Sequence, residues 1–80
     1  METEAALRAL YEEYRRRYFA LDEGGYAVPP ASEVKIEWTK RATASAGLCY
    51  PSKKLIRLSW QYHARFPDEI GPTLLHEMIH

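Results

Sequence analysis

The stretch TLLHEMIH at residues 73–80 decides how the rest of the chain is interpreted, because two histidines in it stand four positions apart. A helix advances about 100° per residue, so His76 and His80 would lie on one face, one turn apart. Two neutral imidazoles suit a zinc ion, which lowers the pKa of a bound water toward about 7. Glu77 would lie beside the same face, where its carboxylate can accept that proton and pass it to a leaving amine. The pattern predicts a zinc-dependent peptide hydrolase, with His76 and His80 as metal ligands and Glu77 as the general base.

The third protein ligand of such a zinc is left open by the sequence. A catalytic zinc takes three protein ligands as a rule, and His63, in the segment WQYHARFP, is the remaining histidine. A lone helical histidine is more often a surface or core residue than a ligand. The terminal carboxylate of His80, a second copy of the chain, or residues beyond position 80 are the other sources. We expect the last of these.

Upstream of the motif, the first part of the chain has helical periodicity. Residues 4–19 carry apolar side chains at the spacing of one helix face, with charged residues mostly on the other side. Thr3 is the expected N-cap, and Asp22-Glu23-Gly24-Gly25 is the expected end of the helix. The apolar positions are Leu7, Leu10, Tyr11, Tyr14 and Tyr18.

The middle of the chain has the two-residue period of strands. Val34, Ile36 and Trp38 alternate with charged residues, which predicts a strand with one buried face. Residues 55–58 predict a second strand, and residues 44–50 a weaker one because of their alanines and Gly47. The segment PSKK at residues 51–54 is typical of a hairpin turn. Together these segments predict a small, mostly antiparallel sheet.

Two helices are expected after the sheet. Ser59 can cap a short helix over residues 60–66, which Pro67 would end. Pro72 is favoured at a first helical position, so a helix over residues 73–80 should carry the histidine motif. The sequence therefore predicts one domain of the α+β class.

Composition and charge indicate which partners and which compartment suit this chain. The chain has 80 residues, and its 11 basic and 11 acidic side chains cancel, so no bulk field draws it to nucleic acid or to an anionic membrane. One cysteine, Cys49, excludes a disulfide within the chain and fits a reducing compartment. The N-terminus lacks the positive charge of a signal peptide, and no apolar run approaches the roughly 20 residues that span a bilayer. We expect a cytoplasmic protein that does not enter the membrane.

Four segments precede TLLHEMIH in a fixed order: LYEEYRRRYF at residues 10–19, VKIEWTKR at 34–41, AGLCY at 46–50 and IRLSWQY at 56–62. Each of these segments is weak evidence alone, but their order and spacing ahead of the motif are specific. Together they resemble the SprT-like zinc metallopeptidase domain. The resemblance covers nearly the whole chain and ends at TLLHEMIH.

The resemblance implies a zincin-like α+β fold, with an N-terminal helix packed on a small sheet, followed by a short helix and the active-site helix. By position, it makes His76 and His80 zinc ligands and Glu77 the general base. Family members supply a third zinc-binding histidine downstream, so residues 1–80 are expected to be the N-terminal portion of the domain. The substrate would be a protein or peptide. The best-known eukaryotic relatives are DNA-dependent proteases, so DNA association is implied by resemblance only, and the oligomeric state stays open.

Two other functions remain as alternatives. The chain could be an interaction module that keeps the fold without a complete site, or a nucleic-acid-binding domain that uses the runs at residues 15–17, 40–41 and 53–54. Short basic runs in a chain of zero net charge are more often a solvated face. Cys49 has no activating neighbour in its local sequence and is assigned no chemistry. For the peptidase, we expect substrate to bind in an extended form along a sheet edge with low side-chain selectivity.

Overall fold

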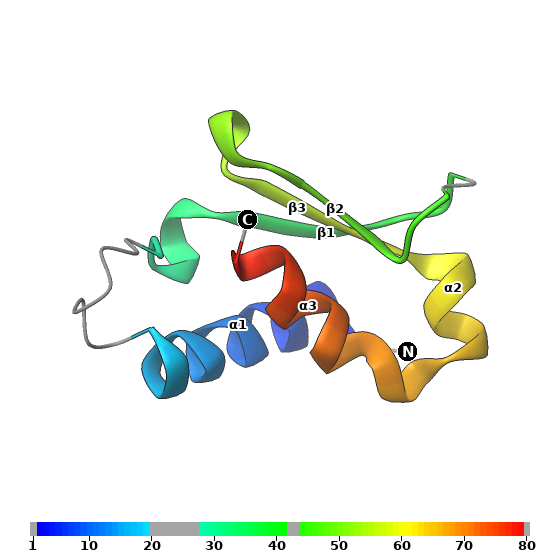
Figure 1. Cartoon of the computed structure of the whole chain (residues 1–80), viewed down its shortest axis with the longest axis horizontal. Helices are drawn as coiled ribbons and strands as arrows, with labels where there is room; N and C mark the ends of the chain where they lie inside the picture. The colour runs from blue at the N-terminus through cyan, green and yellow to red at the C-terminus, as the bar shows by residue number, and fades with distance from the viewer. Residues whose placement is uncertain (1, 20–27, 42–43, 80) are drawn as a thin grey trace.

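The computed structural model describes residues 2–19, 28–41 and 44–79, which form a small sheet with helices α1 and α3 on one face (Figure 1). The α+β class is confirmed. Short 3-10 turns join several of the elements. The regular elements are α1 (Glu4–Tyr18), β1 (Lys35–Thr39), β2 (Gly47–Tyr50), β3 (Leu55–Ser59), α2 (Trp60–Arg65) and α3 (Ile70–Ile79).

Helix α1 forms where the periodicity predicts it. The Thr3 hydroxyl caps it by accepting a hydrogen bond from the backbone N–H of Ala6 at 3.0 Å. Leu7 and Tyr11 are buried on its inner face. The expected turn at residues 22–25 lies outside the described residues. None of the helices in the described ranges is long and apolar enough to cross a membrane.

Side chains of α1 hold the segment that leads into β1. The Tyr11 hydroxyl donates to the Pro29 carbonyl at 2.6 Å, and burial raises the pKa of Tyr11 to about 12. Arg8 donates to the Ala31 carbonyl at 2.9 Å, and the Ala31 N–H donates to the Glu12 carboxylate at 2.8 Å. These bonds satisfy backbone groups of an irregular segment that would otherwise be costly to bury. The segment before β1 is therefore held against helix α1.

The sheet has the order β1-β3-β2, so the predicted hairpin is only part of it. Strands β2 and β3 pair antiparallel through the turn at residues 51–54, whereas β1 pairs parallel with β3. In the parallel register Ile36 lies beside Ile56 and Trp38 beside Leu58, so the apolar rows share one face. Strand β3 has the central position and is the most deeply buried of the three. The sheet is mixed, with β2 at one edge.

The two later helices follow their predicted start signals to different degrees. Ser59 caps α2 as expected, its hydroxyl accepting from the Tyr62 N–H at 3.2 Å. Helix α3 begins at Ile70, three residues earlier than the sequence predicts, after a 3-10 turn at Pro67–Glu69. Pro72 then lies in the first turn, where its missing N–H has no intrahelical acceptor in any case.

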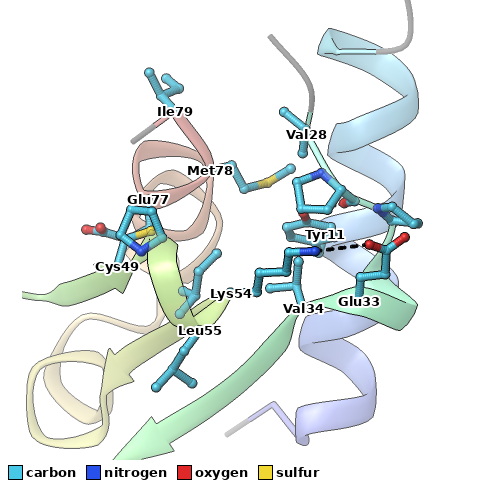
Figure 2. A pocket seen from close by; sticks show the side chains of 14 residues that line it. Tyr11, Val28, Glu33, Val34, Cys49, Lys54, Leu55, Glu77, Met78 and Ile79 are labelled. Carbon is cyan, nitrogen blue, oxygen red and sulfur yellow. Dashed lines mark hydrogen bonds and ion pairs between the residues drawn. The ribbon is translucent and has the colours of Figure 1, made fainter.

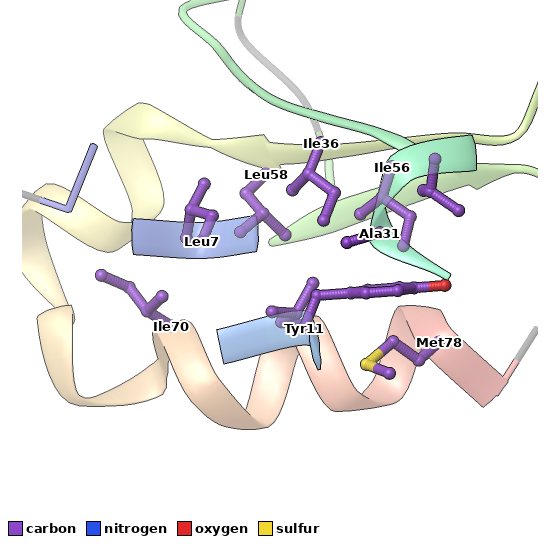
Figure 3. Close-up of a cluster of buried hydrophobic side chains, with 10 residues drawn as sticks. Leu7, Tyr11, Ala31, Ile36, Ile56, Leu58, Ile70 and Met78 are labelled. Carbon is purple, nitrogen blue, oxygen red and sulfur yellow. The ribbon is translucent and has the colours of Figure 1, made fainter. Parts of the chain in front are cut away.

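The hydrophobic core fills the space between the sheet and helices α1 and α3 (Figure 3). Leu74 is fully buried there and fixes α3 against the sheet, with Met78 one turn farther along. The remaining core residues are Leu7, Tyr11, Ala31, Val34, Ile36, Ile56, Leu58 and Ile70.

The first prediction concerns the anchoring of α3. Leu74→Ala removes a side chain with no solvent exposure, so it should lower the free energy of unfolding by about 2–5 kcal/mol. Leu75→Ala is the matched control, because Leu75 is only half-buried and should cost less than half as much. Urea denaturation followed by circular dichroism measures both, and equal losses would contradict the assigned packing.

Candidate functional site

One face of α3 meets the start of edge strand β2 and encloses a groove of about 350 Å³. His76 and Glu77 lie on this face, one turn after Thr73. The groove therefore joins two of the three predicted site residues to a strand edge. Its lining is Ser45, Ala46, Gly47, Glu69, Pro72, Thr73, His76 and Glu77.

The backbone of β2 approaches α3 closely at Gly47. A Cβ atom added there would lie 2.9 Å from Thr73 Cγ2, 3.2 Å from Glu77 Cγ and 3.3 Å from Glu77 Oε2. Real Cβ atoms essentially never come within 3.0 Å of such a neighbour. A residue without a side chain is what allows the strand to rest on the helix beside the Glu77 carboxylate.

Glu77 is buried by this contact, with a relative exposure of 6%. None of the salt bridges between described residues includes it. Burying a carboxylate without a positive partner costs free energy. A cation in the adjacent groove would offset that cost. The buried carboxylate of Glu77 therefore fits a metal ion bound in the groove.

His76 is exposed and lines the groove, so its imidazole is accessible from solvent. His80, the second predicted ligand, lies outside the described residues. Within residues 2–19, 28–41 and 44–79, no three His, Cys, Asp or Glu side chains are grouped so that they could hold a metal ion. The two-histidine ligand pair therefore stays a prediction of the sequence.

His63, considered in the sequence as a third ligand, is a core residue. It has no solvent exposure. Its Nδ1 lies 2.8 Å from the Ser59 carbonyl oxygen, and its Nε2 lies 2.9 Å from the Thr73 hydroxyl. With both ring nitrogens in hydrogen bonds, His63 has no lone pair directed at the groove.

A larger hollow of about 690 Å³ lies on the other side of the β2–α3 contact, and Glu77 lines it as well (Figure 2). Its other lining residues are mostly apolar, and His76 is not among them. The size of this hollow therefore does not make it the reactive site. Cys49 lines it, and burial, followed by the negative charge of Glu77, raises the pKa of the Cys49 thiol. A thiol that stays protonated is a poor nucleophile.

The short basic runs have intramolecular partners in most cases. Arg15 and Arg17 pair with Glu12 and Glu13 on α1. Lys54 pairs with Glu33 at 3.3 Å. Lys40 lies 5.2 Å from the ring centroid of Trp60, and Lys53 lies 5.8 Å from that of Tyr50. These contacts favour the solvated-face interpretation over a nucleic-acid surface.

Comparison with known families decides the classification. The model of the SprT-like family matches residues 7–80, which includes every described element from the first turn of α1 to α3. The chain belongs to the SprT-like family. No curated protein and no solved structure matches it. SprT-like proteins are generally associated with zinc, and membership indicates a metallopeptidase-like domain.

Two residues of this SprT-like site were not singled out from the sequence. Thr73 was interpreted as an ordinary helical position, and Gly47 as a weakness in its strand. A glycine inside a strand pattern often marks a close backbone approach, and that signal could have identified Gly47. Nothing in the sequence indicated that Thr73 would contact both Gly47 and His63.

The second prediction tests the close approach at Gly47. Gly47→Ala should lower the free energy of unfolding by about 1–3 kcal/mol, because the new methyl group would overlap Thr73 and Glu77. Gly71→Ala is the control, because its methyl group would meet only the far end of the Tyr14 side chain, which can move aside. Gly71 lies in the first turn of α3 and precedes Pro72, so alanine brings no helix-interior gain there. Chemical denaturation should therefore show the larger loss for Gly47→Ala, and equal losses would contradict the contact.

Proposed function

We propose that this chain carries the catalytic glutamate and two zinc ligands of a metallopeptidase that hydrolyses peptide bonds. The observation that supports it most is the shared groove, in which His76 and Glu77 lie against the open edge of β2. Family membership supports the same class of function.

His76 and His80 would hold the zinc ion, since histidines four apart on α3 share a face. The third ligand would come from residues outside this chain's described part. Bound zinc would supply a Lewis acid that polarises the scissile carbonyl and makes water acidic near neutral pH.

Glu77 would act as the general base and then as the general acid. Its carboxylate accepts a proton from the attacking water and delivers it to the nitrogen of the leaving amine. Proton transfer needs the carboxylate within hydrogen-bonding reach of the water. Contact with Gly47 limits where the Glu77 side chain can go, so the strand contributes to this placement.

A substrate strand would bind along β2. The Ser59 N–H donates to the Ala46 carbonyl at 2.8 Å, which makes residues 46 and 59 a hydrogen-bonded pair of the antiparallel ladder. Such pairs alternate with non-hydrogen-bonded ones, so the backbone groups of Gly47 and Cys49 point away from β3. The Gly47 carbonyl accepts from the Ser45 hydroxyl at 2.9 Å. An extended peptide could pair with this edge beside Glu77.

The substrate class we propose is protein chains in extended form, including proteins associated with DNA. The extended form follows from the strand edge, and the DNA association follows only from resemblance to DNA-dependent proteases. Because most of the basic runs have partners within the chain, a direct role of residues 1–80 in DNA binding is not part of the proposal.

The third prediction tests Glu77 directly. In the intact protein, Glu77→Gln should reduce proteolysis by about 100-fold or more, because the amide cannot accept and return a proton. Zinc content, counted by native mass spectrometry, should not change, because both imidazoles remain.

Glu69→Gln is the matched control, since Glu69 lines the same groove and has no role in proton transfer. It should keep most of the activity. If Glu77→Gln remained active, the assigned base would be wrong. If the intact wild-type protein bound zinc and never cleaved an unfolded substrate, the interaction-module alternative would replace the peptidase.

The fourth prediction concerns selectivity. Backbone pairing with β2 recognises peptide groups rather than side chains, so cleavage sites in an unfolded protein should be spread over many sequence contexts. Mass spectrometry of the products maps these sites. A strict requirement for one residue type beside the cleaved bond would rule out binding dominated by the strand edge.

A further inference from the structure

His63 is a buried polar group for which the proposed chemistry has no use. Its ring lies between α2, β3 and α3, with ring centroids 5.0 Å from Tyr62 and 5.7 Å from Trp38. A histidine with no solvent exposure needs partners for both nitrogens, and it has them in Ser59 and Thr73.

For the neutral ring, the Ser59 carbonyl fixes the tautomer. The Ser59 carbonyl can only accept, so His63 Nδ1 carries the hydrogen and donates to it. The Nε2 atom of this neutral tautomer has a lone pair, which accepts the hydrogen bond from the Thr73 hydroxyl at 2.9 Å. His63 therefore connects the end of β3 to a defined rotamer of Thr73 on α3.

That rotamer sets the direction of the Thr73 methyl group. The hydroxyl and the methyl are attached to the same Cβ atom, and a β-branched side chain in a helix has few allowed rotamers. With the hydroxyl held by His63, Cγ2 is directed at Gly47. The same glycine lies against Glu77, one helical turn after Thr73. The spacing between β2 and Glu77 thus depends on the His63–Thr73 hydrogen bond.

We propose that His63 is a positioning residue, which acts through Thr73 and Gly47 to hold Glu77 at the place where it transfers protons. This inference rests on the proposed function, since it takes Glu77 as the base. It assigns His63 no contact with metal or substrate. His76 and His80 belong to one helix, so their mutual spacing does not depend on this hydrogen bond. The inference therefore separates proton transfer from metal binding.

The test uses two substitutions of Thr73 that divide its functions. Thr73→Val keeps the shape and the methyl group and loses the hydroxyl, whereas Thr73→Ser keeps the hydroxyl and loses the methyl group. Leu10→Ala is the control for stability, because Leu10 packs against the core from α1 and does not line the groove. If Thr73→Val does not fold, Thr73→Ala replaces it, since it places no methyl group against the ring nitrogen.

Two measurements are made on each variant. In the intact protein, Thr73→Val should lower kcat on an unfolded substrate by roughly 10-fold, because small displacements of catalytic groups have large effects. Thr73→Ser should lower kcat as well, because it keeps the hydrogen bond to His63 and loses the methyl group that lies against Gly47. Zinc affinity, measured by competition with a coloured chelator, should be unchanged in both. Equal losses of kcat in Thr73→Val and Leu10→Ala, or a parallel loss of zinc affinity, would overturn the proposal.

The second measurement does not depend on activity. In the metal-free chain, nuclear Overhauser effects between Gly47 Hα and the Glu77 side chain report the β2–α3 contact. They should weaken in both Thr73→Val and Thr73→Ser and persist in Leu10→Ala, and the His63 nitrogen shifts should show the Nδ1–H tautomer. Unchanged contacts in Thr73→Val, or the Nε2–H tautomer in the wild type, would overturn the inference. Lack of cleavage by the wild-type protein would refute the proposed function, while these contacts would still decide whether His63 positions Glu77.

Discussion

The contact between the backbone of β2 and one face of α3 is the constraint on which the rest of the site depends. It exists because residue 47 has no side chain, so the strand can lie against Thr73 and Glu77. The contact has two consequences. It buries Glu77 to 6% relative exposure, and it leaves the outer edge of β2 next to His76 and Glu77. A strand edge and a buried carboxylic acid side chain are thereby placed side by side.

The remaining structure supports α3 through the hydrophobic core. Leu74 and Met78 belong to this core, and α1 completes it beneath the sheet (Figure 3). The α1 side chains also tie down the segment before β1, through Tyr11, Arg8 and Glu12. Burial of apolar side chains holds α3 against the core, but the hydrophobic effect has no direction and does not set the exact position of each side chain. The finer placement depends on directional contacts, which are the glycine approach and the His63–Thr73 hydrogen bond.

Local signals in the sequence were sufficient for most elements. The Thr3 and Ser59 caps, the periodicity of α1 and the alternation around Ile36 each depend on residues near in sequence, and each is found as predicted. The parallel pairing of β1 with β3 was not predictable, because it joins residues far apart in sequence, such as Ile36 and Ile56. The start of α3 was misplaced by three residues, because Pro72 is acceptable anywhere in a first turn. His63 could not be classified from sequence, since a ligand and a core histidine look the same until their partners are known.

The residues of the site are specified in two ways, one local in sequence and one not. The spacing of His76 and His80 is local, because any helix places residues four apart on one face. The placement of Glu77 is not local, because it is set by Gly47, about thirty residues away in sequence, and through Thr73 by His63. A helix with the same motif in another setting would keep the spacing of the two histidines and lose the contacts that place the glutamate. Under the proposed function, metal binding by this SprT-like chain would therefore be encoded in the motif itself, and proton transfer would be encoded in the fold that surrounds it.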